Sequence, residues 1–147
     1  MLALSITDVR GFMSKLLKEE AFDNFALKST IIDTFVRFEI YAAAATNNDA
    51  VEPPKWRNVR DHVFGVIKGA ATPKSIKVVL GGDVDKAGCV NAASALINIQ
   101  FDDGKISIVT GLSQKSFSLD KSDETRWDDW VKGFLTQHNI GFVNNLQ

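Results

Sequence analysis

Cysteine and histidine are scarce in this sequence, and their scarcity excludes several classes of protein. The single cysteine, Cys89, allows no internal disulfide, which suits a reducing compartment. The two histidines, His62 and His138, lie far from Cys89 and from each other in the chain. Metal sites in proteins need clustered ligands at recognisable spacings. We therefore expect no metal site.

The sequence also lacks an excess of charge of one sign and has no long apolar run. Lys and Arg total 17 against 18 for Asp and Glu, so the formal net charge is −1. Such a balance creates no overall field favouring nucleic acid or an anionic membrane. No stretch approaches the ~18–20 apolar residues of a membrane span, and residues 1–5 lack the basic start of a signal peptide. We expect a cytoplasmic protein with neither nucleic acid nor a membrane as its partner.

Motifs that carry a catalytic or cofactor mechanism are missing as well. The segment 83–88 begins like a calcium loop, but Ala87 stands where an oxygen ligand is needed and no glutamate follows at the required offset. Gly81 and Gly82 follow an apolar strand pattern without either phosphate-loop motif. No serine, histidine and aspartate stand in a nucleophile-elbow context. We expect no cofactor and assign no catalytic residue.

The clearest structural signal is a hairpin between 95 and 110 that turns at Asp103 and Gly104. Asp-Gly between two alternating apolar runs is typical of a tight turn in which both central residues have positive φ. The two-residue loop places Phe101 opposite Ile106 and Ile99 opposite Ile108. These four apolar side chains then share one face of the sheet.

Three amphipathic helices are predicted from apolar residues at helical spacing. The first runs from Val9 to about Lys18, with Ser5 or Thr7 as its cap; the second follows Pro53 and Pro54; and the third is capped by Ser122, with Asp123 and Glu124 in its first turn. Their apolar stripes consist of Val9, Phe12, Met13, Leu16 and Leu17; of Trp56, Val59, Val63, Phe64 and Ile67; and of Trp127, Trp130, Val131, Phe134 and Leu135.

Period-two patterns predict the remaining strands. We expect an edge strand at 2–4, one long strand at 30–41, a strand at 76–80 and a last strand at 116–119, with a surface loop at 42–52. Polar residues occupy the second face of most strands, which is typical of an antiparallel sheet with one wet side. The chain is therefore predicted to be a single α+β domain, 1–147. Its expected architecture is a two-layer sandwich: a twisted antiparallel sheet of five or six strands, with about three helices mainly on one face.

Several short stretches resemble a family of short uncharacterised proteins, a domain of unknown function, from clostridia-type Gram-positive bacteria. The stretches are 6–9, 12–17, 22–23, 68–69 with 72–73, 110–111, 117–120 and 127–128. The resemblance spans nearly the whole chain and implies a bacterial protein, but no activity, cofactor or site residue.

Two groups of residues are candidates for binding. Trp127, Trp130 and Phe134 have core spacing, and we favour core filling, although bulky aromatics under a curved sheet can also line a ligand cavity. Phe35, Arg37 and Tyr41 fall on the wet face of the predicted long strand and could form an apolar contact surface rimmed by charge. The alternative is that the loop 42–52 or the C-terminal 140–146 folds back over Phe35 and Tyr41.

Three classes of function are compatible with these sequence features. We favour a non-catalytic binding or assembly protein, including a homo-oligomer, because no reactive constellation is visible. The first alternative is a carrier of a small apolar ligand, held between the sheet and the C-terminal helix. The second is an enzyme whose reactive residues converge only in space. A cavity, or carboxylates meeting a histidine or lysine in a cleft, would favour the alternatives.

Overall fold

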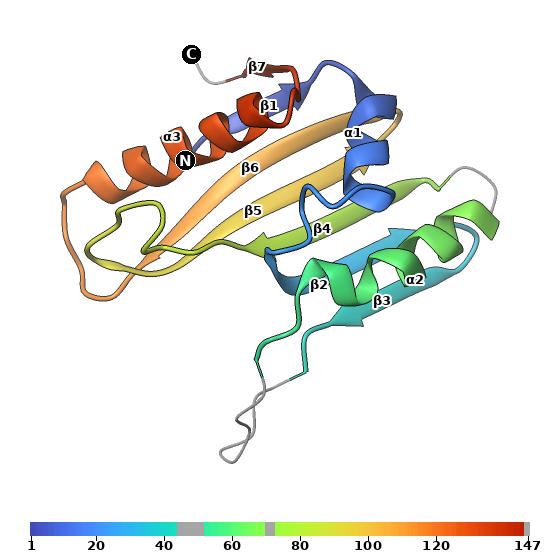
Figure 1. Cartoon of the computed structure of the whole chain (residues 1–147), viewed down its shortest axis with the longest axis horizontal. Coiled ribbons are helices and arrows are strands. Elements are labelled where there is room, and N and C mark those ends of the chain that lie inside the picture. The colour runs from blue at the N-terminus through green and yellow to red at the C-terminus, as the bar shows by residue number, and fades with distance from the viewer. Residues whose placement is uncertain (44–51, 70–72, 146–147) are drawn as a thin grey trace.

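A single antiparallel sheet organises the computed structural model, which describes residues 1–43, 52–69 and 73–145. These residues form three helices and seven strands, and the strand order is β3-β2-β4-β5-β6-β1-β7 (Figure 1). The strands are β1 (Ala3–Ile6), β2 (Ala26–Asp33), β3 (Arg37–Tyr41), β4 (Ser75–Gly81), β5 (Ala92–Asp102), β6 (Lys105–Gln114) and β7 (Phe142–Asn144). The α+β class and the antiparallel sheet are confirmed. The predicted count of five or six strands is wrong.

The central hairpin forms as predicted. Asp103 and Gly104 connect β5 to β6 with φ values of 52° and 73°, the left-handed conformation that such a turn requires. Phe101 pairs with Ile106, and Ile99 pairs with Ile108. This hairpin fixes the register at the middle of the sheet.

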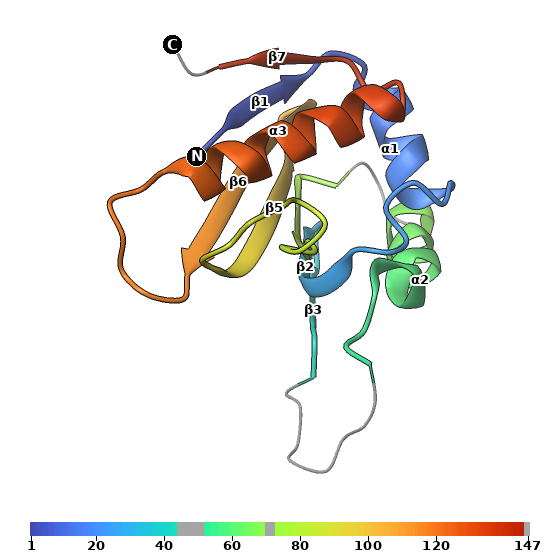
Figure 2. The same ribbon diagram turned by 60° about the vertical axis from the view of Figure 1, so that its left-hand side comes forward.

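The helices lie over one face of the sheet in both ribbon views (Figures 1 and 2). They are α1 (Val9–Leu17), α2 (Trp56–Gly69) and α3 (Ser122–Gln137). Beneath them, the sheet contributes buried side chains from its four longest strands, including Ile32, Val78, Ile97, Ile99 and Ile108. The opposite face carries Lys77, Asn98 and Gln100 and has no helix over it among the described residues.

The structure differs from the prediction in how the N-terminal ends of α1 and α3 are capped. Asp8, not Ser5 or Thr7, caps α1, because its carboxylate accepts a hydrogen bond of 3.0 Å from the Gly11 amide. At α3, Ser122 is the first helical residue and makes no cap; it donates to Asp120 from both its amide and its hydroxyl. Both corrections concern the capping residue alone: α1 begins at Val9 as predicted, α3 begins at Ser122, and the buried stripes stay in place.

The predicted long strand 30–41 is instead a hairpin of β2 and β3, turning at 34–36. Thr34 makes the turn: its amide donates to the Val36 carbonyl, and its hydroxyl both accepts from the Val36 amide and donates to the Val36 carbonyl. Phe35 therefore sits at the tip of a turn, 87% exposed, and does not lie on a strand face. Arg37 and Tyr41 do face the open side, opposite Asp33 and Ser29.

The structure also differs from the predicted fold at the two ends of the chain and in the segment between β6 and α3. The segment 116–119 is a loop, with Phe117 and Leu119 largely exposed, and Ser116 is held by Asn91. Strand β1 is not at an edge, because β7 pairs with its far side. The C-terminal residues thus lie at the opposite edge from Phe35 and Tyr41 and do not cover them. Most of the predicted loop 42–52 falls outside the described residues.

Candidate functional site: an aromatic cleft

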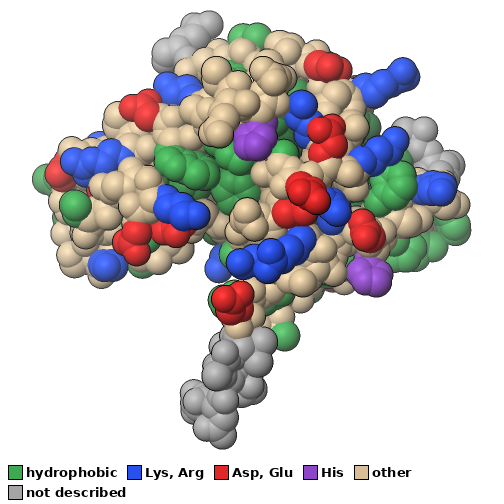
Figure 3. Space-filling model, viewed as in Figure 1, with side chains coloured by type: hydrophobic (Ala, Val, Ile, Leu, Met, Phe, Trp, Pro, Cys, Tyr) green, Lys and Arg blue, Asp and Glu red, His purple; other side chains and the backbone are tan. Residues whose placement is uncertain are grey.

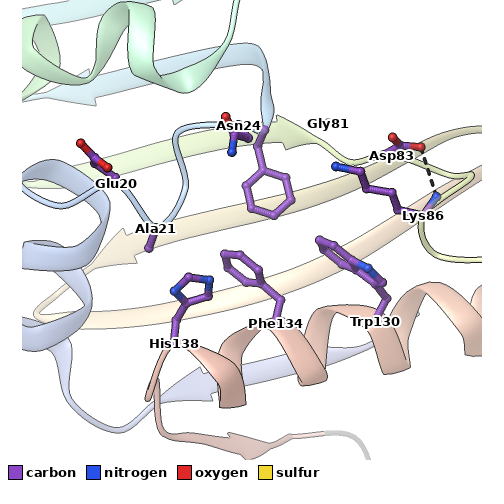
Figure 4. A pocket seen from close by; sticks show the side chains of 10 residues that line it. Glu20, Ala21, Asn24, Gly81, Asp83, Lys86, Trp130, Phe134 and His138 are labelled. Carbon is purple, nitrogen blue, oxygen red and sulfur yellow. Dashed lines mark hydrogen bonds between the residues drawn. The ribbon is translucent and has the colours of Figure 1, made fainter.

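A cleft of about 280 Å³ opens on the helix-covered side, between α3 and two loops that meet over the end of β4 (Figure 4). Phe25, Trp130 and Phe134 form its apolar wall, together with Ala21 and Gly81. Its polar rim consists of Glu20, Asn24, Asp83, Lys86 and His138. Apolar side chains reach the molecular surface in this region, between α3 and the lower half of the sheet in that view (Figure 3).

The aromatic wall is built by helical spacing along α3. Trp127, Trp130, Phe134 and His138 succeed one another at intervals of three or four residues, so their side chains point to the same side of the helix. The Trp127 and Trp130 rings are parallel, with centroids 5.2 Å apart, and Trp130 and Phe134 are parallel at 5.7 Å. The His138 imidazole lies 4.4 Å from the Phe134 ring. The row runs from the core at Trp127 to the cleft at Trp130 and beyond.

The loop 19–25 closes one side of the cleft by packing edge-on against this row. The Phe25 ring lies 5.0 Å from Phe134 and 5.8 Å from Trp130, nearly perpendicular to both. The loop is anchored to α2, since the Trp56 amide donates to the Phe25 carbonyl at 2.9 Å and Arg60 pairs with Asp23 at 2.9 Å. Edge-to-face contacts of this kind stabilise a pair by ~0.5–1.5 kcal/mol beyond the area they bury. The Phe25 side of the cleft is therefore firmly held.

The loop 82–91 forms the other side and is tied down at both ends. At its start, a Cβ atom on Gly82 would overlap the Trp127 ring, so only glycine allows this approach. At its end, the Asp123 carboxylate accepts from the Asn91 amide at 2.7 Å and the Val90 amide at 3.0 Å. Between these anchors, Asp83 accepts from the amides of Asp85 and Lys86. The Lys86 side chain extends toward the cleft (Figure 4).

Asp123 is the electrostatic centre of this second anchor. Its side chain is almost fully buried, and Arg126 adds a third hydrogen bond at 2.7 Å. The hydrogen bond from the Asn91 amide, followed by that from Val90, lowers the pKa of Asp123 below its ordinary value. Cys89 lies beside it, half-buried, with Sγ 3.6 Å from the Asp123 carbonyl oxygen. Burial and then the charge of Asp123 raise the pKa of the Cys89 thiol, which makes it a poor nucleophile.

The three tryptophans differ in the hydrogen-bond acceptors of their indole N–H groups. Trp56 donates to the Leu16 carbonyl at 2.8 Å, and Trp127 donates to the Leu96 carbonyl at 3.1 Å. Within the described parts of the chain, the indole N–H of Trp130 has no hydrogen-bond partner. Trp130 is also the half-buried one of the three. Trp130 is thus the one tryptophan of the three whose indole N–H has no protein acceptor among the described residues.

The titratable side chains of the rim do not contact one another. No ion pair or side-chain hydrogen bond joins Glu20, Asp83, Lys86 and His138 within residues 1–43, 52–69 and 73–145. The same ranges contain no group of three or more His, Cys, Asp or Glu that could hold a metal ion. They also contain no helix with the length and hydrophobicity to cross a bilayer.

The structure separates the three aromatics that the sequence singled out. Trp130 and Phe134 line the cleft, whereas Trp127 is fully buried and borders a smaller hollow of about 170 Å³ near Thr110 and Asp128. Phe35, Arg37 and Tyr41 lie at the distant β3 edge and take no part. His62 is an exposed residue of α2.

The residues of the polar rim were not predicted. Glu20 and Asn24 come from a loop before β2, and Asp83 and Lys86 come from a loop after β4. The one available signal was Gly81-Gly82 directly after a strand, which marks a close approach of backbone to a neighbour. That neighbour is the Trp127 ring.

Fold and cleft together define the class: an α+β protein whose one antiparallel sheet carries an aromatic cleft among its helices. The chain belongs to DUF5721, a family of unknown function, whose sequence model matches residues 15–143. The resemblance noted from the sequence to a domain of unknown function is confirmed to this extent. Neither the curated proteins nor the solved structures contain a match to the chain.

Proposed function

We propose that this protein is a non-catalytic binding protein whose aromatic cleft holds a small planar ligand. The observation that carries the proposal is Trp130, which lines the cleft with its ring half-buried and its indole N–H unpartnered among the described residues. A buried tryptophan usually finds an acceptor for this donor, whereas that of Trp130 is not a buried atom and is open to a ligand or to water. A ligand that brings a ring and a hydrogen-bond acceptor supplies what Trp130 lacks.

The shape of the cleft favours a ligand of one or two rings. Its volume of about 280 Å³ lies just below the ~300–1,000 Å³ of sites for drug-sized molecules. Phe25, Trp130 and Phe134 pack against one another and present one aromatic wall, on which a flat ring buries more surface than a branched chain.

The charge of the rim favours an uncharged or cationic ring over an anion. Glu20 and Asp83 bring two carboxylates to the opening, and Lys86 brings one ammonium. Like charges in a small cleft repel, and an aromatic wall attracts a cation through its ring faces. We therefore infer a heteroaromatic ligand that is neutral or positively charged.

Binding is favoured over catalysis because the rim groups are dispersed. General acid–base chemistry needs a base within hydrogen-bond reach of the proton it takes and a second group to orient it. One carboxylate oxygen of Asp83 accepts from two backbone amides, and none of the described rim side chains pairs with another. An enzyme remains the second candidate, because two carboxylates, a lysine and a histidine do line one cleft.

We propose further that the molecule is a two-layer sandwich and that it functions in the cytoplasm. In both ribbon views the helices gather on one side of the sheet, so the cleft opens through the helix layer (Figures 1 and 2). The half-polar rim argues for a soluble heteroaromatic ligand and against the purely apolar ligand of a carrier. The single cysteine is compatible with a reducing cytoplasm.

Saturation-transfer NMR with defined probes tests the proposal. The probes are adenine, nicotinamide and indole as planar rings, with hexanoate and cyclohexanol as non-planar controls. We expect transfer to at least one planar probe and none to the controls. Trp130→Leu should weaken that binding about tenfold or more, which corresponds to ~1.4 kcal/mol.

Phe117→Leu is the matched control variant. Phe117 is 87% exposed in the loop before α3 and does not line the cleft, so its replacement should leave probe affinity unchanged. The proposal is wrong if no planar probe binds, or if Trp130→Leu and Phe117→Leu bind the probes equally well.

A further inference from the structure

The free edge of β3 is a second surface with a specific chemistry. β3 is the last strand at its end of the sheet, and no described residue pairs with its outer side (Figure 1). The Ala42 amide donates to the Lys28 carbonyl of β2 at 3.1 Å. In an antiparallel pair the direction of backbone groups alternates, so Phe38 and Ile40 also face β2. The backbone groups of Arg37, Glu39 and Tyr41 therefore point to the free edge.

Exposed apolar side chains concentrate at this edge. Phe35, Val36, Phe38 and Tyr41 are 87%, 46%, 38% and 59% exposed, and we call them the edge patch. They are four of the nine large hydrophobic side chains that are exposed in the described residues, gathered within seven positions. Clustering of this kind marks a contact surface, whereas single exposed hydrophobics need no explanation.

We propose that β3 pairs with β3 of a second copy of this chain, antiparallel and about a two-fold axis at Phe38. In that register Arg37 stands opposite Glu39 of the other copy, and by symmetry Glu39 stands opposite Arg37. Both are residues whose backbone groups face the edge, so each pair exchanges two N–H···O=C hydrogen bonds. The pairing joins two sheets into one continuous sheet.

The side chains are complementary only in this register. The two Phe38 side chains meet at the axis, and the turn residues Phe35 and Val36 of one copy lie beyond the paired segment, next to the Ile40 and Tyr41 end of the other. Arg37 and Glu39 already pair within one chain, Nε to Oε1 at 3.0 Å, on the same face of β3. Moving the axis to Arg37 or Glu39 would set like charges directly opposite each other, which is unfavourable.

The charges select the partner. Charged residues on an edge strand normally oppose pairing with other strands. Here one positive and one negative residue, two positions apart, find two attractions in a copy of the same strand. In a strand with charges of one sign they would find one attraction and one repulsion. A C2 interface uses the same patch twice, as this register does.

Sedimentation equilibrium of the full chain tests the pairing with charge variants. The wild-type mass should rise from 16.2 kDa toward twice that value between low and high micromolar concentration. Arg37→Glu and Glu39→Arg should each stay monomeric, because each sets like charges opposite each other. Mixing these two variants should restore a dimer of mixed composition, because the two carboxylates on one variant then face the two guanidinium groups on the other.

The mixing step separates lost pairing from lost folding, since a misfolded variant would not regain a partner. Lys77→Glu is the matched control: Lys77 is exposed on the open face of β4, away from the edge, and this variant should dimerise like the wild type. A wild type that stays monomeric at high micromolar concentration overturns the proposal. A dimer unaffected by the two edge variants also overturns it, because its interface then lies elsewhere.

Discussion

At the residue scale, one glycine decides whether α3 can reach the sheet. Gly82 lies against Trp127, and a Cβ atom there would overlap the indole ring. Trp127 is fully buried and donates to the Leu96 carbonyl, so its ring cannot swing aside. The same ring begins the aromatic row that forms the cleft wall.

Gly82→Ala should destabilise the protein by ~1–3 kcal/mol, the usual cost of overpacking a core. Gly133→Ala is the control: Gly133 lies within α3 with nothing near its Cβ position, and alanine should stabilise the helix by ~0.5–1 kcal/mol. Urea unfolding of both variants measures the two changes. Equal or inverted effects would show that Trp127 does not pack on Gly82.

A second prediction at this scale concerns Asp123 and acid. The folded state lowers the pKa of this carboxyl below 3.8, chiefly through the Asn91 and Val90 amides. A lowered pKa means that its contribution to stability is complete above 3.8 and is lost as the pH falls through the folded-state pKa. The urea midpoint should therefore fall as the pH drops below 3.8.

Asp123→Asn should flatten part of this acid dependence and lower the midpoint at neutral pH, because an amide offers one acceptor oxygen to two backbone amides. Asp120 also has a lowered pKa, through the Ser122 hydroxyl and then the Ser122 amide, and acts in the same range. Comparing Asp120→Asn with Asp123→Asn shows how much of the loss of stability in acid comes from each carboxylate. An acid slope that Asp123→Asn leaves unchanged would contradict the role of Asp123.

At the element scale, α3 presents two kinds of aromatic position. Trp127, Val131 and Leu135 are buried under the helix, whereas Trp130 and Phe134 are half-buried at the cleft. Trp127→Ala should cost ~3–5 kcal/mol, as for a core aromatic. Trp130→Ala should cost less, ~1–2 kcal/mol, since its ring is only partly buried and lies at the cleft. Urea midpoints distinguish them, and equal losses would mean that Trp130 is a core residue.

A helix or strand could be predicted from the sequence where the alternation of apolar and polar residues is interrupted at its ends. Asp103 and Gly104 interrupt the alternation with residues that tolerate positive φ, so the β5–β6 hairpin and its register could be predicted. The turn at 34–36 left no such mark. A three-residue turn puts Asp33 opposite Arg37, an even separation, so the period-two pattern continues unbroken through it.

Other elements were missed because their pairing depends on distant parts of the chain. Strand β7 has three residues and exists because β1 offers a free side to it. The predicted strand at 116–119 has the right alternation but finds no strand to pair with among the described residues, and Asn91 takes up the backbone of Ser116 instead. Alternation alone therefore does not establish a strand.

At the scale of the whole molecule, the sequence singled out the aromatics of the cleft wall, for which core filling was favoured, and none of the rim residues from the two loops. The wall follows from the spacing of Trp130 and Phe134 on one helix. The rim brings together loops at 19–25 and 82–91, whose meeting depends on the anchors at Trp56, Gly82 and Asp123. These anchors are long-range contacts without a local sequence signature. In the same whole-molecule view, β3 lies at the far end of the sheet with no further strand beside it among the described residues (Figure 2).

The central claim is that Trp130 forms a binding site for a planar ligand, and its indole N–H tests this most directly. In a ¹⁵N–¹H spectrum, Trp56, Trp127 and Trp130 give three indole signals, assigned by Trp130→Phe. The first two N–H groups are held by the Leu16 and Leu96 carbonyls and serve as internal controls. Titration with adenine, nicotinamide and indole should shift the Trp130 signal most and leave that of Trp56 in place. If the Trp130 signal stays fixed with every planar probe, or moves no more than that of Trp56, the claim is contradicted.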